Sequence, residues 1–505
     1  MKKNIIFCIL VLFGCVSCDS FLEPNSQTEF VPETAVSLNE MLLGEAYPRS
    51  TDGKSVFALH PLFDDDLTCS NFAGTPNVNN ATRFTVYQAL YSWQPDMFVT
   101  MDNLGMFSGN NTWQGLYIRI RGTNAALDYL DDVTGTVEEK AIVRAQAHAL
   151  RAFYYFNLVN LWGEPYNYNK KALGVPLKTT SAMEAMELPR NTVEEVYNLI
   201  LEDLNQAESA YEALPEGMQF RRDYRTSLPM VQLLKSRVFL YMENWKDAAT
   251  YANKVINDWS FSLLNLNTLK APSAQEPYYN FLTMDSPEVI WNFGSTDDLL
   301  TFMTIYISQS TTSGTTTTTI TRKKFNASNS LLDSYGSGDL RKDRYIVKEY
   351  EDQSRYLPYG KMGFTYKHEP INSTYFGMAF RVAEAYLNLA EASAMDNDET
   401  TALWALNELR RNRVADYEDV SGVRGDDLVE MIRQERRLEL CFEGHRWFDL
   451  RRYGMPSFSR EWWNDGVLVK QYTLEKNDPS YTLPIPQAVI ELNRQLEQNK
   501  LANPR

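Results

Sequence analysis

The chain has 505 residues, a formal net charge of −16 at pH 7 and 13% aromatic residues, including 29 Tyr and 10 Trp. A net-anionic surface repels phosphate backbones, so the composition disfavours nucleic acid as a partner of the whole protein, and we expect none. The hydrophobic content of 44% is ordinary for a globular protein, whereas the aromatic content is high. At about 150 residues per domain the length allows three domains, and one elaborated domain is also possible.

The first residues, "MKKNIIFCILVLFGCVSC", are typical of an exported protein. Two lysines precede an apolar run that is too short to span a bilayer permanently, which predicts a signal peptide over residues 1–17. Small residues precede Cys18, so we expect this cysteine to be lipidated, with Cys15 as a poorer alternative. No later stretch approaches the ~20 apolar residues of a membrane helix, so membrane attachment is expected through the acyl chains on Cys18.

An irregular segment is expected at about residues 47–110, which is rich in Asn, Asp, Phe and Tyr. Within it, "RFTVYQALYSW" (83–93) predicts a strand or a short helix. Residues 111–162 have helical period and predict two packed helices, the second ending at Gly163. The next helix opens with a capping box, Thr192 with Glu195, and stops before Pro215.

Two helical hairpins are the clearest units further along the chain. Residues 228–258 form one, with a turn through Glu243 and Asn244, and residues 377–414 form another, with a turn at 396–398. Both have the Ala, Leu and Tyr spacing of tetratricopeptide helices without a strict 34-residue period. A last long helix is expected to begin near Gly425.

Between residues 259 and 376 the helical period is lost. Ser, Thr, Gly, Pro and aromatic residues dominate there, with a low-complexity "TTSGTTTTTITRKK" (311–324) and strand-like pieces such as "EVIWNFG". Irregular segments of this length inside a compact domain are usually functional. The sequence therefore predicts a helical scaffold at about 111–258 and 377–453, with loop-rich insertions at about 47–110 and 259–376.

Catalytic and metal-binding motifs are not found in the sequence. The histidines at positions 60, 148, 368 and 445 lack ligand spacing, and Cys69 and Cys441 are too far apart in sequence to indicate a disulfide framework or a zinc site. Asp64, Asp65 and Asp66 could hold calcium, but a solvated turn is the favoured interpretation because the spacing of a calcium loop is missing. We expect no metal and no cofactor. With 65 acidic residues a glycosidase pair cannot be recognised or eliminated from the sequence.

The segment "RQERRLELCFEGHRWFDLRRYG" (433–454) is dense in charge. On one helix Glu435, Glu439 and Glu443 would form a stripe of like charge that needs arginine partners. Candidate partners are Arg436, Arg446 and the arginines at 410, 411 and 413. Because the guanidinium group satisfies several carboxylates at once, we expect an inter-helix ion-pair clamp anchored by Trp447 and Phe448, and not a catalytic site.

This segment resembles the C-terminal signature of the SusD/RagB family of outer-membrane lipoproteins from the Bacteroidota. Other matching pieces follow in the family's order: "CDSFLEPN", "WQGLYIRIRGTNAAL", "RAQAHALRAFYYFNLVNLWGEP", "FRVAEAYLNLAEASA", "ALNELRRNR" and "YTLPIPQAVIELN". The ending "LNRQLEQNKLANPR" departs from the family's usual close.

The resemblance implies an all-α domain over residues 18–505, with about four tetratricopeptide-like helix pairs and a loop-rich, aromatic ligand face. It also implies a lipid-anchored protein on the outer surface of the outer membrane. Such a protein binds a glycan, delivers it to a SusC-like TonB-dependent transporter and is not an enzyme.

Sugar binding needs aromatic platforms for C–H faces and polar groups for hydroxyls. The candidate ligand residues are Tyr91 and Trp93 with Asn71, Asn80 and Arg83 in the first irregular region, and Tyr278, Phe302 and Tyr306 in the second; packing beneath the loops is the alternative for each. The residues expected to be core are Trp113, Tyr117, Trp162, Trp291 and Trp447.

Three other functions stay open. Some relatives handle peptides, so peptide capture is the nearest alternative. A glycoside hydrolase and a purely structural helical-repeat scaffold are the others.

Overall fold

We describe a computed structural model of the chain. It describes residues 32–48, 56–57, 59–76, 80–106, 112–182, 187–295, 298, 305–349, 354–357, 360–361 and 376–505. The signal-peptide region and Cys18 lie outside these residues, as does Phe302.

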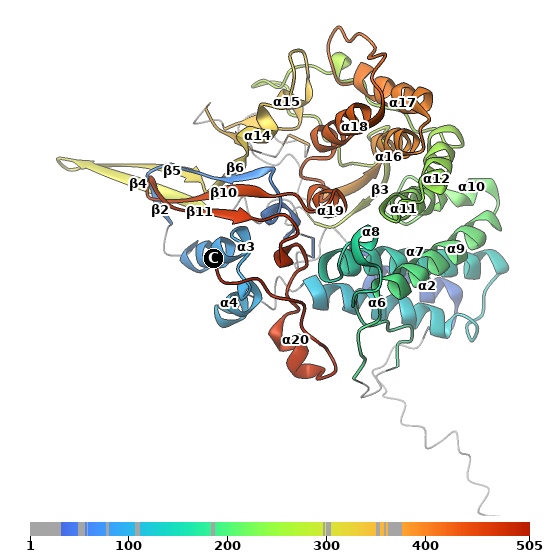
Figure 1. Cartoon of the computed structure of the whole chain (residues 1–505). Helices are drawn as coiled ribbons and strands as arrows, with labels where there is room; N and C mark the ends of the chain where they lie inside the picture. Colours follow the sequence, from blue (N-terminus) through green and yellow to red (C-terminus); the bar gives the residue numbers. More distant parts are fainter. Residues whose placement is uncertain are drawn as a thin grey trace, which may run out of the picture.

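Most of the longer helices gather on one side of the molecule, and most of the strands lie on the other side together with several of the helices (Figure 1). The longer helices are α2 (Ala35–Glu45), α3 (Ala81–Tyr91), α6 (Thr112–Tyr129), α7 (Val137–Trp162), α9 (Val193–Glu212), α11 (Leu228–Tyr241), α12 (Trp245–Asn257), α16 (Val382–Met395), α17 (Glu399–Arg411) and α18 (Gly425–Leu440). The shorter ones are α4 (Met97–Asn103), α8 (Tyr166–Asn169), α10 (Glu216–Gln219), α14 (Asn329–Leu332), α15 (Arg341–Arg344), α19 (Arg446–Arg452) and α20 (Gln487–Leu492), with 3-10 turns at His60–Leu62, Leu266–Thr268 and Pro479–Tyr481.

Side-chain caps set the ends of several helices. Thr192 accepts a hydrogen bond from the backbone N–H of Glu195, and the Glu195 carboxylate accepts from the Thr192 N–H, which confirms the predicted capping box. α7 has the same box at Thr136 and Glu139 and ends before Gly163, as predicted.

The two predicted helical hairpins are present and share one turn geometry. α11 and α12 are joined through Glu243, which has φ +60°, and α16 and α17 through Asn397, which has φ +64°. In each turn the next residue caps the second helix: Asn244 accepts from the N–H of Asp247, and Asp398 accepts from the N–H of Thr401. The two turns therefore have the same backbone conformation and the same kind of side-chain cap.

The expectation of an all-α fold is wrong in detail, because the described residues include several small antiparallel sheets. Their pairings are β1–β6, β10–β11, β2–β4–β5, β3–β9 and β7–β8. The strands are β1 (Leu67–Cys69), β2 (Thr75–Pro76), β3 (Val289–Phe293), β4 (Tyr306–Ser313), β5 (Thr316–Lys323), β6 (Phe325–Ala327), β7 (Val347–Lys348), β8 (Tyr356–Leu357), β9 (Met378–Arg381), β10 (Phe458–Asn464) and β11 (Val467–Leu474).

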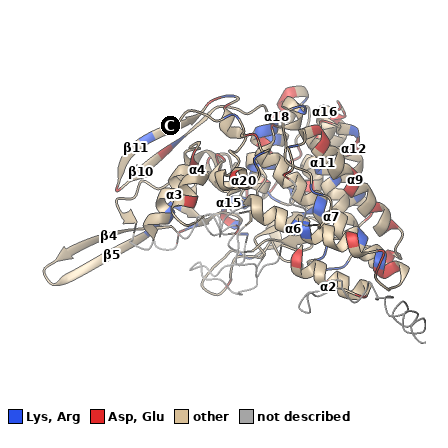
Figure 2. Cartoon of the chain, turned by 90° about the horizontal axis from the view of Figure 1, so that it is seen from below, with Lys and Arg blue, Asp and Glu red and all other residues tan. Residues whose placement is uncertain are grey.

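The low-complexity segment forms most of a long two-stranded ribbon, β4–β5, which extends away from the helices (Figure 1). Its pairing runs from Tyr306 opposite Lys323 to Ser313 opposite Thr316. Cross-strand hydroxyl pairs join its two strands, for example Ser310 Oγ to Thr319 Oγ1 at 2.9 Å. Figure 2 shows that the outer part of this ribbon carries no charged residue.

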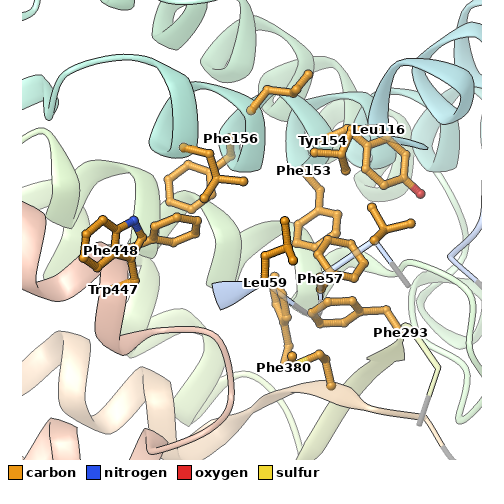
Figure 3. Packing of buried hydrophobic residues seen from close by; sticks show 14 of the residues in the cluster. Phe57, Leu59, Leu116, Phe153, Tyr154, Phe156, Phe293, Phe380, Trp447 and Phe448 are labelled. Carbon is orange, nitrogen blue, oxygen red and sulfur yellow. The ribbon is translucent and has the colours of Figure 1, made fainter. Parts of the chain in front are cut away.

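Aromatic rings fill the centre of the core (Figure 3). Phe153 of α7 lies at its middle, with ring centroids 5.2 Å from Trp291 and 5.0 Å from Phe293. Trp113, Trp162, Trp291 and Trp447 are buried, as predicted, and Tyr117 is partly buried with its hydroxyl donating to the Pro176 carbonyl at 2.7 Å. None of the helices in the described ranges is long and apolar enough to cross a membrane.

The charged segment is not one helix, as we expected, but two. α18 ends at Leu440, and the chain turns through Phe442 and Gly444, which have φ +61° and +78°, before α19 begins at Arg446. Glu443 therefore lies in the turn and not on the helical stripe.

The predicted ion-pair clamp is present. Arg413 Nε lies 2.8 Å from Glu439 Oε2, and Arg410 Nε lies 2.7 Å from Glu435 Oε2. Arg381, from the distant strand β9, lies between Glu439 at 3.0 Å and Glu443 at 2.6 Å. The clamp is buried, so its charges are neutralised by each other and not by water.

Three of the expected partners have other roles. Arg436 pairs with Asp449 at 2.9 Å, and Arg446 pairs with Asp65 at 2.6 Å. Arg411 lies at the surface with Glu408 and Asp419. Arg436 therefore joins α18 to α19, and Arg446 joins α19 to the loop that contains Asp65, so neither arginine neutralises the glutamate stripe.

The aspartate triplet is neither the solvated turn that we favoured nor a calcium loop. Asp64 and Asp66 are buried, and Asp66 accepts a hydrogen bond from Arg437 at 2.7 Å while Asp65 accepts from Arg446. Within the described residues, His, Cys, Asp and Glu side chains form no group of three or more that could hold a metal ion. The triplet thus ties the N-terminal loop to the C-terminal helices.

Candidate functional site

A polar hollow of about 290 Å³ opens on the strand-rich side of the molecule. Four separate parts of the chain form its walls: β1 with the residues after it, β6 with α14, the segment around β8, and β10. The lining residues are Thr68, Cys69, Ser70, Asn71, Asn326, Ala327, Asn329, Leu332, Ser354, Arg355, Tyr356, Glu461 and Trp463. This set combines two aromatic rings with amide, hydroxyl and charged groups.

Strand pairing and one arginine hold these walls together. β1 pairs with β6 from Leu67 opposite Ala327 to Cys69 opposite Phe325. Arg355 then crosses the walls, donating to Ser70 Oγ at 2.8 Å and to Asn326 Oδ1 at 2.8 Å. Because the fork of a guanidinium fixes the geometry of both partners, the polar groups of the hollow are pre-oriented.

Trp463 supplies the largest aromatic surface of the hollow. It follows the buried Trp462 in β10, and neighbouring side chains of a strand point to opposite faces, so Trp463 is directed outward and is only half-buried. Its indole N–H donates to Glu461 Oε2 at 2.9 Å, and its backbone N–H donates to Cys69 Sγ at 3.3 Å. These contacts fix the ring at the edge of the hollow.

A buried layer supports the hollow from beneath. The Tyr91 hydroxyl accepts from the Cys69 N–H at 3.2 Å, and burial raises the pKa of Tyr91. The Lys324 ammonium donates to the Trp463 carbonyl and lies 4.7 Å from the Trp462 ring centroid. Burial lowers the pKa of Lys324, and it raises the pKa of the Cys69 thiol.

Of the predicted ligand residues, Asn71 lines the hollow, where its side chain is exposed. Tyr91 and Trp93 are fully buried, so neither ring has a face that a ligand could reach. In this structure the two residues are not aromatic platforms for a sugar. The Trp93 indole N–H donates to the Phe63 carbonyl at 3.0 Å, and Arg460 lies 4.0 Å from the Trp93 ring. Their role in this structure is to pack beneath the site.

The other predicted residues lie around the hollow or away from it. Asn80 occupies the N-cap position of α3, which begins at Ala81, and Arg83 lies in the first turn of this helix. Both are outside the lining of the hollow. Tyr306 lies at the base of the β4–β5 ribbon, with the Lys323 ammonium 3.8 Å from its ring centroid. Tyr278 is half-buried, and the pKa of its hydroxyl is raised by burial and by the charge of Asp343 in α15.

Sequence reasoning missed most of the hollow, including Trp463, Glu461, Tyr356 and Arg355. One signal was available for Trp463: two consecutive tryptophans in a strand cannot both face the core. The other lining residues come from short strands separated by long stretches of chain, and no local pattern indicates that such strands meet.

The hollow can bind a hydrophilic ligand through hydroxyl and amide hydrogen bonds and one aromatic platform. Among its described lining residues, Glu461 is the one carboxylate, whereas acid–base glycoside hydrolysis uses two facing carboxyl groups. Cys69, which also lines the hollow, and Cys441 are both buried free thiols.

The fold and the hollow define a helix-rich protein whose surface site is built from short strands of distant parts of the chain. A family model described as "SusD family" matches residues 285–501, and one described as "Starch-binding associating with outer membrane" matches residues 24–229. The chain belongs to the SusD/RagB family.

Both the sequence relatives and the solved structures match this chain over almost its whole length. SusD-like protein P25 and SusD-like protein P2 of Formosa agariphila are 22% and 26% identical, each over 99% of this chain and 99% of its own length. A SusD-like carbohydrate binding protein from Bacteroides vulgatus is 21% identical with a TM-score of 0.67, covering 93% of this chain and 99% of its own. A SusD superfamily protein from the same species is 19% identical with a TM-score of 0.70, covering 92% and 99%. The helix-rich fold is therefore the SusD fold.

Proposed function

We propose that this protein binds a glycan in the polar hollow and delivers it to a SusC-like TonB-dependent transporter of the outer membrane. The observation that carries the proposal is the hollow itself, where Trp463 and Tyr356 stand beside Asn71, Asn326 and the other polar lining groups. A sugar ring has a C–H face that packs on an aromatic ring and hydroxyl groups that pair with amides and hydroxyls.

The relatives support this ligand class and location. One matching family model is described as starch-binding and outer-membrane-associated, and one solved structure is described as carbohydrate binding. We extend both descriptions to this chain, with residues 1–17 as a signal peptide, Cys18 as the lipid anchor at the cell surface, and residues 18–505 as one domain built on tetratricopeptide-like helix pairs.

The proposal is for capture without turnover. A glycosidase needs a second carboxyl group across the scissile bond from the first, and the described lining of the hollow supplies Glu461 alone. Release of reducing ends from a bound polysaccharide, abolished by Glu461→Gln, would overturn this part of the proposal.

The test is affinity gel electrophoresis of purified protein against a panel of soluble polysaccharides. We expect at least one polysaccharide to retard the wild type and Trp463→Ala to weaken that binding about tenfold or more, because it removes the main aromatic surface. Trp404→Ala is the matched control, since Trp404 is 42% exposed on α17, away from the hollow, and its loss should leave retardation unchanged.

Two results would contradict the proposal. If peptides bound and no polysaccharide did, the ligand class would be wrong. If deletion of the gene left nutrient uptake intact at unchanged transporter abundance, the delivery role would be wrong.

A further inference from the structure

A second hollow of about 280 Å³ lies away from the first, between the C-terminal end of α7 with α8 and the C-terminal tail. None of its lining residues belongs to the first hollow. It is similar in volume to the candidate glycan site, and the proposed function leaves it unused. Its polar side chains include Glu164, Arg190, Asn477, Asn499 and Lys500.

One buried arginine fixes the floor of this second hollow. Arg190 donates to the carbonyls of Trp162 at 3.0 Å, Leu173 at 2.7 Å and Glu497 at 2.9 Å, and to Asn499 Oδ1 at 2.7 Å. Arg190 therefore connects the C-terminal end of α7, the segment after α8 that contains Leu173, and the C-terminal tail around Glu497 and Asn499. Because these carbonyls and the amide occupy its donors, Arg190 does not make the hollow an anion site.

Glu164 is the unusual group of the second hollow. Its Oε2 atom is buried but accepts no hydrogen bond from the residues that the structure describes. A buried polar atom without a hydrogen-bond partner costs on the order of 1–3 kcal/mol. The charge of the buried Arg451 interacts with the Glu164 carboxylate, and a hydroxyl donor from a ligand would supply the hydrogen bond that Oε2 lacks. A carboxylate accepts strong hydrogen bonds from hydroxyl groups and repels anions.

Tyr168 provides an apolar face at the rim. It lies in the short helix α8 and is 57% exposed, which leaves a large aromatic surface in water. An exposed ring next to amide and carboxylate groups is the combination that sugars use, with C–H groups on the ring and hydroxyls on the polar groups.

We propose that this second hollow binds a single neutral pyranose unit, either a free sugar or the end of a glycan chain. Glu164 accepts a hydrogen bond from a ring hydroxyl, the exposed Asn477 side chain contacts a neighbouring hydroxyl, and Tyr168 packs on the C–H face. The Asn499 amide is already held by Arg190 and by the carbonyls of Trp162 and Leu483, so it shapes the wall of the hollow. The inference rests on the proposed glycan function and adds a second site to it. A neutral sugar is favoured over an acidic one because the Glu164 carboxylate would repel a uronic acid or sulfate.

The test uses saturation-transfer NMR on the full mature chain carrying Trp463→Ala, which disables the first hollow. The probes are the methyl glycosides of glucose, galactose, mannose and xylose at millimolar concentration. We expect at least one probe to give a signal in this background, and Tyr168→Ala or Glu164→Gln to reduce its affinity about tenfold.

Matched controls are Tyr129→Ala, since Tyr129 is 40% exposed on α6, and Glu202→Gln on the exposed face of α9. Thermal melting of each variant identifies a folding defect, and the tyrosine and glutamate variants test the site independently. No signal from any of the four probes, or a signal unchanged in both site variants, would overturn the proposal.

The outcome separates the two hollows. If Trp463→Ala abolishes polysaccharide binding while Tyr168→Ala and Glu164→Gln change nothing, the proposed function stands and the second site fails. If no polysaccharide binds the wild type but a methyl glycoside binds in a Tyr168-dependent way, the second site stands and the first fails.

Discussion

Glu439 lies at the centre of the buried clamp. It pairs with Arg413 at 2.8 Å, with Arg381 at 3.0 Å and with Arg341 at 3.4 Å, and its side chain is fully buried. Burial alone would raise the pKa of Glu439, but Arg413 and Arg381 hold it well below its usual range. The sequence indicated Arg413 as a partner because it was expected at the end of the preceding helix, and it lies two residues beyond the end of α17 at Arg411. Arg341 and Arg381 come from distant segments that carry no such signal.

We expect Glu439→Gln to lower the free energy of unfolding by about 3–5 kcal/mol, because it leaves buried guanidinium groups without a counter-charge. Urea unfolding followed by tryptophan fluorescence measures the loss. Glu408→Gln is the control: Glu408 pairs with Arg411 at the surface, and its replacement should cost no more than about 1 kcal/mol. Equal losses in the two variants would mean that the clamp does not stabilise the fold.

A pH dependence follows from Glu391, which receives two hydrogen bonds from Arg452 at 2.6 and 2.7 Å. Burial would raise its pKa, but Arg452 lowers it from 4.5 to about 2. Since the folded pKa is lower than the unfolded one, the stabilisation is present above pH 4.5 and is lost as the pH falls toward 2.

We expect Glu391→Gln to be less stable at pH 7 and to lose less stability than the wild type between those two pH values, by up to about 3 kcal/mol. Urea midpoints across the acid range provide the measurement. Glu202→Gln, at an exposed site of α9, should follow the wild-type curve. Parallel curves for Glu391→Gln and the wild type would contradict the assignment.

At the scale of elements, helices were predictable because their ends carry local signals. Thr192, Gly163 and the two hairpin turns mark boundaries that the structure confirms. The break between α18 and α19 was missed because charge spacing continued across Gly444, although glycine is the usual residue for a positive φ. The Thr-rich segment has no period that distinguishes a ribbon from a loop, so β4–β5 could not be predicted, and neither could the short strands that form the hollow.

Gly444→Ala tests this break. A Cβ at this position would lie 3.2 Å from His60 Nδ1, and the φ of +78° is strained for alanine, so we expect a loss of about 1–2 kcal/mol in unfolding free energy. Gly454→Ala is the matched control, since its φ of +86° is similar but a Cβ there meets no atom within 4 Å. A larger loss at Gly454 would mean that crowding at the α18–α19 turn is unimportant.

At the scale of the whole molecule, one hydrophobic cluster includes residues from Ala35 to Leu496. The ion pair between Asp65 and Arg446 joins a loop near the N-terminus to helix α19 near the C-terminus. Few parts of the fold can therefore lose their contacts independently, since helices and strands share this core.

We expect a single cooperative unfolding transition, with the same urea midpoint by far-UV circular dichroism and by tryptophan fluorescence. Two resolved midpoints would show that the helical side and the strand side unfold separately. Repeating the measurement with Asp65→Asn tests the link between this loop and α19, and we expect a lower midpoint without a second transition.

The walls of the first hollow impose an order on its formation. Cys69 and Trp463, which touch across it, are 394 positions apart in the chain. Closing a loop of that length costs chain entropy before any contact across the hollow stabilises it, so this pairing belongs to the late steps of folding. A nascent chain that has not yet emerged as far as β10 lacks one wall, and ligand binding can therefore report that folding is complete.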